Sequence, residues 1–417
     1  MLVCPDCFAN TGLQNRIKTI RPNFDDGACY AHVTKKGVPL EAVARIIEEV
    51  IRNNFHLSGF DYKGEPLGES LIDVIYCLTE AHDHEVVEAL QSVLIEEDEY
   101  WPPDGEEPFF SEENGYQKTV EVFDEQRSRR WEEFREVIIS QQRFFSDDAK
   151  RILTEIFDGL HLLRDDRNEP AVMALEPGKH TVFRARRANT QSTQDKIYGD
   201  AARELGPPPS ALRIAGRMNP SGIKAFYGAF DIETCLAEMR PAVGETIVTA
   251  EFRLVRPVVV LDTTKFERPP KSQNIFTVTH NKRLMLWAFM AEFMSEISIP
   301  TLPEEEHLSY IPTQVVAEYL VHLHKFKFGS GERTVDGIIF QSAQKEGGKN
   351  IVLFGDAANV LMPEDASIKQ WPKWPKQADS KPTLDVVQNS LVSHRIESVR
   401  VNTSVFFGGP DNSPDDF

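Results

Sequence analysis

The spacing of apolar residues changes once along this chain, near residue 175, and the change predicts two parts of different architecture. Before it, apolar residues recur with the period of an amphipathic helix, as in LEAVARIIEEVIRN at 40–53. The same period appears at 71–78, 131–138 and 152–157. After it, TIVTAEFRL at 246–254 alternates as a strand does, and PVVVLD at 257–262 is typical of a buried strand. We therefore expect an α+β protein whose helical part precedes a part built on a sheet.

The second part contains further segments of both kinds. Additional strands are predicted at 179–186, 336–342, 350–354 and 394–401, and helices at 283–294 and 313–326. Residues 188–213 are rich in Gln, Ser, Thr and Pro, which predicts a loop that could cover a ligand. Residues 95–110 predict an acidic loop broken by prolines, and 368–384 and 409–417 predict tails with little core.

The charge of the chain is unevenly distributed. At 417 residues it is long enough for two or three domains, and its net charge is -19. In residues 1–170 acidic residues are twice as numerous as basic ones, which disfavours nucleic-acid binding because phosphate backbones repel such a surface. No apolar run is long enough to span a membrane and the N-terminus lacks a secretory signal, so we expect a protein of the reducing cytoplasm.

A metal-ligand pattern lies at the N-terminus. Cys4, Cys7, Cys29 and His32 form C-x2-C-x21-C-x2-H, which can place three sulfurs and one nitrogen tetrahedrally around zinc. Four protein ligands leave no open position, so the expected zinc site is structural and holds the N-terminus onto the residues that follow. The alternative is that these side chains are small buried hydrophobes, but the paired spacing favours zinc.

The segment 214–240, IAGRMNPSGIKAFYGAFDIETCLAEMR, carries the chemistry of a candidate active site. Arg217 can hold a phosphate by paired hydrogen bonds, and Tyr227 can stack on a flat ring. Glu238 can stabilise a developing sugar cation or activate a nucleophile. These are the groups needed to cleave the bond between a ribose and a good leaving base. Each residue alone could equally be structural, so the pattern by itself is a hypothesis.

The second part of the chain resembles the RES family, named for its shared Arg, Glu and Ser residues. The resemblance covers about 230 residues and rests on these motifs: VFRARR at 182–187, GRMNPSG at 216–222, FYGAFDIETCLAEMRP at 226–241, YIPTQVVAEYL at 310–320 and DGIIFQSAQKEGGKNIVLF at 336–354. Many members read GGRWNP where this chain reads AGRMNP, so Ala215 and Met218 depart from the pattern. The departures leave the arginine and Asn219 in place.

The resemblance implies a mixed-sheet fold like that of ADP-ribosyltransferases, with NAD as the substrate. The family's arginine, tyrosine, glutamate and serine fall on Arg217, Tyr227, Glu238 and Ser342, and the arginine of its first strand falls on Arg184. The arginines would bind phosphate oxygens, and Ser342 would donate a hydrogen bond to a phosphate or ribose. Several members are toxins of bacterial toxin–antitoxin pairs, which implies a separately encoded antitoxin as a partner.

The first part resembles, more weakly, the helical domain that precedes some RES domains and is related to HEPN proteins. The Arg and His pair of HEPN nucleases is not found at the end of a later helix, so this domain is expected to be non-nucleolytic. The predicted domains are a zinc-knuckle-like element at 1–36, a helical domain at 37–175, a RES domain at 176–408 and an acidic tail at 409–417.

The sequence thus predicts an enzyme that cleaves NAD at the nicotinamide–ribose bond, as a glycohydrolase or phosphorylase with a toxin or defence role. Two alternatives remain open: a protein ADP-ribosyltransferase using the same pocket, and a non-catalytic protein that senses a nucleotide and binds a partner. The sequence does not fix the oligomeric state, and a homodimer would be compatible with it.

Overall fold

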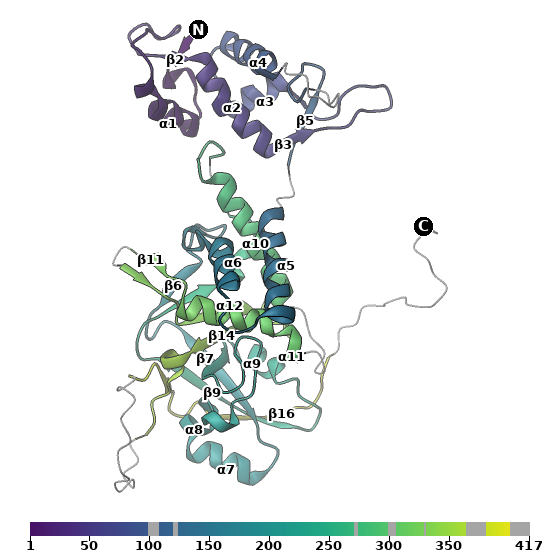
Figure 1. Cartoon of the computed structure of the whole chain (residues 1–417). Coiled ribbons are helices and arrows are strands. Elements are labelled where there is room, and N and C mark those ends of the chain that lie inside the picture. Colours follow the sequence, from purple (N-terminus) through teal and green to yellow (C-terminus); the bar gives the residue numbers. More distant parts are fainter. Residues whose placement is uncertain are drawn as a thin grey trace. The chain divides into compact units, whose positions relative to one another are not determined.

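The computed structural model describes residues 1–98, 108–119, 124–270, 274–298, 306–328, 331–363 and 381–400, which form two compact units (Figure 1). The first unit consists of Met1–Glu132, Ile156–Pro170 and Lys265–Glu292. The second unit consists of Glu133–Glu155, Ala171–Thr264 and Phe293–Phe417. The chain therefore enters each unit more than once, a connectivity that its hydrophobic pattern does not reveal.

Helices dominate the N-terminal residues of the first unit. They are α1 (Thr11–Ile20), α2 (Leu40–Asn54), α3 (Leu71–Thr79) and α4 (His84–Asp98). The helices expected at 40–53 and 71–78 are confirmed as α2 and α3. The acidic loop expected from residue 95 begins later, because α4 continues to Asp98, and residues 99–107 lie outside the described residues.

Side-chain caps explain where two of these helices begin. The Asn10 side chain accepts hydrogen bonds from the backbone N–H groups of Gly12 and Leu13, at 3.0 and 3.3 Å, at the start of α1. Ser70 accepts one from Asp73 N at 3.3 Å at the start of α3. Such caps satisfy N–H groups that have no partner inside the helix.

Small sheets also occur in the first unit, in a region expected to be helical. β1 (Leu2–Val3) pairs with β2 (Val38–Pro39). β5 (Gly115–Lys118) lies between β3 (Phe55–Leu57) and β4 (Glu69–Ser70). A Cβ on Gly115 would lie 2.0 Å from the carbonyl oxygen of Leu67, so only glycine allows this close approach.

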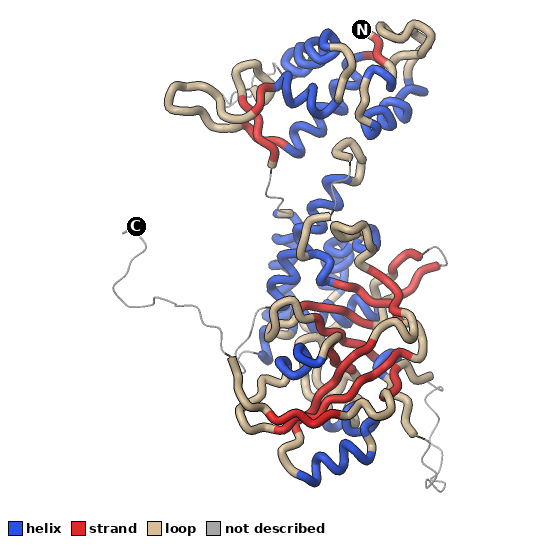
Figure 2. Tube along the Cα trace, turned by 180° about the vertical axis from the view of Figure 1, so that it is seen from behind, coloured by secondary structure: helices blue, strands red, loops and turns tan. Residues whose placement is uncertain are grey.

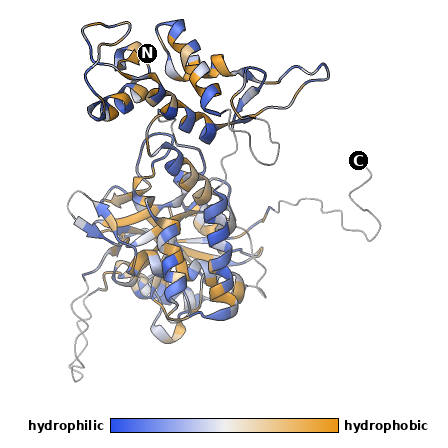
Figure 3. Cartoon of the chain, turned by 45° about the horizontal axis from the view of Figure 1, so that its top comes forward, coloured by the Kyte–Doolittle hydropathy of each residue, from blue (hydrophilic) through white to orange (hydrophobic). Residues whose placement is uncertain are grey.

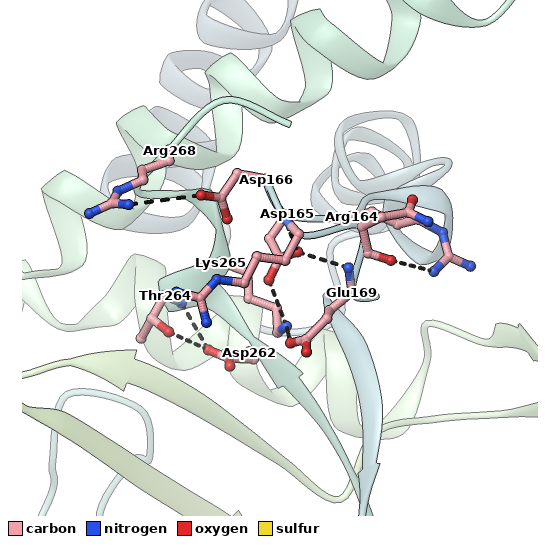
Figure 4. Close-up of polar contacts among 10 residues, drawn as sticks. Arg164, Asp165, Asp166, Glu169, Asp262, Thr264, Lys265 and Arg268 are labelled. Carbon is pink, nitrogen blue, oxygen red and sulfur yellow. Dashed lines mark hydrogen bonds and ion pairs between the residues drawn. The ribbon is translucent and has the colours of Figure 1, made fainter. Parts of the chain in front are cut away.

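An ion-pair cluster fixes the loop at 164–170 (Figure 4). The Lys265 ammonium donates to Asp165 at 2.9 Å and to Glu169 at 2.6 Å. The Asp165 carboxylate also accepts from the backbone N–H groups of Arg167 and Glu169, at 2.9 and 2.8 Å. Burial alone would raise the pKa of Asp165, but Lys265 and these N–H groups hold it below its ordinary value.

The second unit is built on a nine-stranded mixed sheet (Figure 2). The strand order is β15-β9-β7-β8-β14-β13-β10-β6, and β16 also pairs with β9. Among the strands that the structure describes, only β10 and β13 pair in parallel. The strands are β6 (Val172–Leu175), β7 (Thr181–Arg187), β8 (Ala225–Ala229), β9 (Thr246–Leu254), β10 (Val258–Asp262), β13 (Gly337–Gln341), β14 (Lys349–Phe354), β15 (Leu384–Val386) and β16 (Val392–Arg395). A separate antiparallel pair is formed by β11 (Phe326–Phe328) and β12 (Gly331–Arg333).

Most of the strands of the large sheet were expected from the sequence. β7, β9, β10, β13 and β14 confirm the segments predicted near them. β16 covers only the start of the segment expected at 394–401, and β15, which was not expected, begins at the last residue of the tail predicted at 368–384. Residues 364–380 and 401–417 lie outside the described residues. β6 precedes residue 176, at which the sheet domain was taken to begin, and the domain limits drawn from the sequence stay a prediction.

The loop expected at 188–213 is largely helical. It contains α7 (Gln191–Gly199) and α8 (Ala201–Leu205), which lie together beyond β9 in Figure 1. Thr190 caps α7 by accepting from Thr193 N at 3.3 Å, and Asp200 caps α8 by accepting from Arg203 N at 3.1 Å. The polar residues that suggested a loop are thus helix caps and exposed helix positions around a few buried apolar side chains.

The core of the second unit lies against the central strands, which Figure 3 colours mainly as hydrophobic. The Phe226 and Phe252 rings meet edge to face, with centroids 5.0 Å apart. The remaining helices are α5 (Glu125–Glu136), a π-helical turn at Val137–Gln141, α6 (Asp147–Phe157), α9 (Ile232–Glu238), α10 (His280–Ser298), α11 (Glu306–Ser309) and α12 (Ile311–His322). Searching the described residues for a helix that is both long and apolar enough to cross a membrane finds none.

Candidate active site

The turn at Gly216–Asn219 places Arg217 beside β8. Gly216 N donates to Asn219 O at 2.9 Å, and the Asn219 amide donates to Pro220 O at 3.1 Å. The Tyr227 hydroxyl donates to Asn219 Oδ1 at 2.7 Å and accepts from Met218 N at 3.1 Å. Burial raises the pKa of Tyr227, so this hydroxyl stays neutral and joins the turn to β8.

Gly216 is needed because the turn packs directly on Tyr227. A Cβ at this position would lie 2.8 Å from the Tyr227 hydroxyl oxygen and 2.8 Å from Asn219 Oδ1. The other side of the turn is held by α12. Thr313 Oγ1 donates to Arg217 O at 2.6 Å, and Gln314 Nε2 donates to Gly216 O at 2.8 Å. The backbone of Arg217 is therefore fixed from two directions.

Arg184 supplies a cation that the described residues do not neutralise. Its guanidinium carbon lies 4.7 Å from the centre of the Phe226 ring, and its buried Nη1 atom has no hydrogen-bond partner among the described residues. Burial lowers the pKa of Arg184 to about 10, so the group is charged at neutral pH. A buried charge without a partner is unfavourable, and a bound anion would remove that penalty.

Glu238 ends α9, which begins at the Asp231 cap, where Asp231 Oδ1 accepts from Thr234 N at 2.7 Å. Glu238 Oε1 accepts from Ser342 Oγ at 2.6 Å and from Asn350 Nδ2 at 2.7 Å. Within the described part of the chain, no hydrogen bond reaches its second oxygen, Oε2. The residue is exposed, so one carboxylate oxygen is fixed while the other is available to a ligand.

Ser342 is oriented by the turn after β13. Its hydroxyl oxygen accepts from the backbone N–H groups of Gln344 and Lys345, both at 3.1 Å. The hydroxyl proton is therefore directed at Glu238. In this structure Ser342 contacts the carboxylate, whereas the sequence predicted a contact with a phosphate or ribose.

A cavity of about 360 Å³ brings these groups together. Arg184, Arg217, Tyr227 and Glu238 all line it, and Ser342 reaches it through Glu238. Its lining also includes residues that the sequence interpretation did not assign to the site, namely Cys235, Arg240, Tyr310 and Gln344. Asn350 lines it as well.

Tyr310 and Arg240 add to the chemistry of the cavity. The Arg217 guanidinium carbon lies 4.9 Å from the centre of the Tyr310 ring, a cation–π contact. Arg240 adopts a left-handed backbone with φ of 43°. Arg187 donates to the Arg240 carbonyl oxygen at 3.2 Å and pairs with Glu245 at 3.2 Å, so Arg187 has a structural role. Tyr310 is the first residue of the motif YIPTQVVAEYL at 310–320, so the sequence contained a signal for it although no chemical role had been assigned to it.

The four predicted metal ligands also meet, in the first unit. Their ligand atoms lie within 4.8 Å of one another. Cys4 Sγ lies 4.0 Å from Cys7 Sγ and 3.4 Å from His32 Nδ1, and Cys7 Sγ lies 3.4 Å from Cys29 Sγ. A tetrahedral zinc ion with bonds of about 2.3 Å to sulfur and about 2.0 Å to nitrogen requires ligand separations of this size. The set fits such an ion.

The three thiols of the cluster differ in pKa, since burial raises the pKa of Cys4 and raises that of Cys7 to about 12. Burial alone would raise the pKa of Cys29, but the backbone and side chain of His32, together with Cys7, lower it to about 6. A thiolate is the form of cysteine that binds metals. Cys77, in contrast, is exposed and lies outside the cluster.

Comparison with known proteins agrees with the geometry of the second unit. No curated protein and no solved structure gives a significant match to the chain. The family comparison does give one, and it covers the cavity-lining residues from Arg184 to Asn350: residues 181–375 match the RES domain.

Proposed function

We propose that this protein is an enzyme that consumes NAD by breaking the bond between nicotinamide and ribose. The observation that carries the proposal is the pairing, in one cavity, of two groups: an Arg184 guanidinium whose buried Nη1 atom has no hydrogen-bond partner among the described residues, and a Glu238 carboxylate held through only one oxygen. The arginine suits the anionic pyrophosphate, and the carboxylate suits the cationic ribose that forms as the bond breaks. The match to the RES domain supports NAD as the substrate.

The reaction needs charge stabilisation more than acid catalysis. Nicotinamide in NAD is already a cationic leaving group, so no proton has to be delivered to it. Arg184 and Arg217 would bind phosphate oxygens and fix the dinucleotide, while Glu238 Oε2 would face the ribosyl cation or orient the acceptor. Tyr310, already in contact with Arg217, offers a ring face to the substrate, and Tyr227 holds the arginine-bearing turn.

The fold and biology proposed with this activity follow from the RES match. We propose an ADP-ribosyltransferase-like arrangement of the mixed sheet and a toxin or defence role held in check by a separately encoded antitoxin. The helical first unit would then serve packing or partner binding. We further propose that the Cys4, Cys7, Cys29 and His32 cluster binds structural zinc.

The first prediction tests catalysis with Glu238→Gln, which keeps an oxygen to accept from Ser342 and Asn350 but removes the charge. We expect turnover of NAD to fall by at least about 100-fold, the scale of one electrostatic catalytic group, with the fold unchanged. Chromatography of NAD incubated with purified protein, with and without phosphate, measures the loss of NAD and identifies the co-product.

Glu346→Gln is the matched control, because Glu346 is an exposed residue of the loop after Ser342. Normal turnover by Glu238→Gln would refute the mechanism. Free ADP-ribose as the product would identify water as the acceptor, and a phosphorylated product would identify phosphate. Nicotinamide release only when a protein acceptor is added would favour ADP-ribosyltransferase activity. Expression that arrests growth with the wild type but not with Glu238→Gln would support the toxin role.

A further inference from the structure

A second cavity, of about 550 Å³, lies in the second unit, and no residue lines both it and the candidate active site. Its lining carries three cations, from Arg203 on α8, Arg213 and Lys224. Its lining also includes the apolar side chains of Leu361 and Met362, which are 45% and 47% exposed. A cavity lined by both cations and apolar side chains suits a small ligand with the same two properties.

Two of the three cations have no carboxylate partner among the described residues. Arg213 donates to the carbonyl oxygens of Pro208 and Gly222, at 2.9 and 3.1 Å, which fixes its guanidinium without neutralising it. Lys224 donates to the neutral amide oxygen of Asn359. Burial, and then the nearby charge of Arg213, lower the pKa of Lys224, and the opposing charge of Asp356 offsets them only in part. Arg203 pairs with Asp200 at 3.3 Å.

The walls of this cavity are built rather than formed by surface side chains alone. Gly206 ends α8 where a Cβ would lie 2.3 Å from Ala202 O, and Pro207, Pro208 and Pro209 follow as a stiff wall. Another lining residue, Leu361, is tied to β15, since Leu361 N donates to Leu384 O at 2.7 Å. Such walls would hold the cations apart before any ligand arrives.

We propose that this cavity binds a small molecule that carries a phosphate group on an apolar body. The site has a direct connection to the candidate active site through one loop. Arg213 O accepts from Gly222 N at 3.1 Å and from Ser221 Oγ at 3.0 Å, which closes the loop that carries Arg217. A ligand held by Arg213 and Lys224 therefore stabilises the base of the loop whose tip lines the active site, and acts as a regulator of that site.

The test is calorimetric titration of the full chain with phenyl phosphate, phenol and inorganic phosphate. We expect phenyl phosphate to bind more tightly than either of the other two probes. Removing one charge-assisted contact in Lys224→Met or Arg203→Met should weaken that binding by at least about tenfold. Lys179→Met, a change at an exposed lysine outside the cavity, should leave it unchanged, and Arg184→Met distinguishes binding at the active-site cavity from binding at this one.

A second measurement does not depend on a variant folding. In the wild type, phenyl phosphate should protect Lys224 from an amine-reactive reagent, as read by mass spectrometry, while Lys179 reacts as before. The proposed site would be overturned if phenyl phosphate did not bind or if its binding were lost only in Arg184→Met. It would also be overturned if phenyl phosphate left Lys224 unprotected. Equal affinity for inorganic phosphate and phenyl phosphate would overturn the claim that the ligand has an apolar body. These readouts need no NAD turnover, so their failure is distinct from failure of the proposed enzyme activity.

Discussion

At the scale of single residues, the candidate active site depends on how one carboxylate is held. Ser342 and Asn350 both donate to Glu238 Oε1, at 2.6 and 2.7 Å, so the carboxylate cannot rotate freely although the residue is exposed. An exposed glutamate without such contacts would sample many rotamers and lose the entropy of fixing one during the reaction. Asn350 is therefore a positioning residue, acting on the substrate through Glu238.

The second prediction concerns Asn350→Ala. Losing one of two hydrogen bonds to a charged group, about 1.5–3 kcal/mol, should lower kcat by about tenfold or more while KM changes little. A merely structural role would instead lower thermal stability and raise KM. The fold loss of kcat in the double variant with Ser342→Ala should be smaller than the product of the two single fold losses, because both residues act on one oxygen. Additive effects would contradict the shared role.

At the scale of elements, the sequence predicted the site residues that lie close together in the chain and missed others that strand pairing brings to the site. Arg217, Tyr227 and Glu238 lie within one segment, so their chemistry could be recognised together. Asn350 is distant in sequence and reaches the site because β14 pairs with β8 in a register that places Asn350 opposite Ala229. Periodicity predicts that a strand exists but not which strand it pairs with. α7 and α8 were missed for a different reason: their polar residues were taken as a loop, whereas Thr190 and Asp200 cap helices there.

The third prediction tests the turn that carries Arg217. Gly216→Ala would press a methyl group against the Tyr227 hydroxyl, so the turn must shift and Arg217 with it. We expect a loss of about 1–3 kcal/mol in the free energy of unfolding and a marked rise in KM for NAD. Gly199→Ala is the matched control, because a Cβ added to Gly199 would meet no atom within 4 Å and its backbone is not left-handed. Equal behaviour of the two variants would show that the turn tolerates the methyl group.

At the scale of the whole molecule, the chain folds into two units, and each unit is formed by segments that are not contiguous in sequence. Residues 265–292 belong to the first unit although they follow several strands of the sheet in the second. Lys265, with 8% of its side chain exposed, pairs with Asp165 and Glu169, which fixes the start of this returning segment. The helical period at 283–294 predicted α10 but could not assign it to a unit, because periodicity reports a buried face and not what covers it.

The fourth prediction is a pH dependence of the first unit. The pKa of Asp165 is lowered in the folded protein, so its contribution to stability is present above the unfolded value of 3.8 and is lost as pH falls further. The pKa of Lys265 is raised, so its contribution is lost only at strongly alkaline pH. Lys265→Met should lower the free energy of unfolding at pH 7 by about 1–3 kcal/mol, and the difference from wild type should shrink below about pH 4. Urea unfolding at both pH values measures this, and a difference independent of pH would contradict it.

The fifth prediction concerns metal removal, and it separates the two units. Cys4, Cys7 and Cys29 belong to the same buried cluster as the residues of α2, so a zinc ion on these thiolates would be coupled to folding of the first unit. We expect one zinc per chain, lost with a strong chelator or in Cys4→Ser but retained in Cys77→Ser. In the stripped protein, hydrogen exchange should accelerate in α2 while β8 and β14, which have a separate core, keep their protection. Uniform loss of protection would mean that the units unfold together. Full protection throughout would mean that the cysteines act as packed apolar side chains, and that the first unit needs no metal to fold.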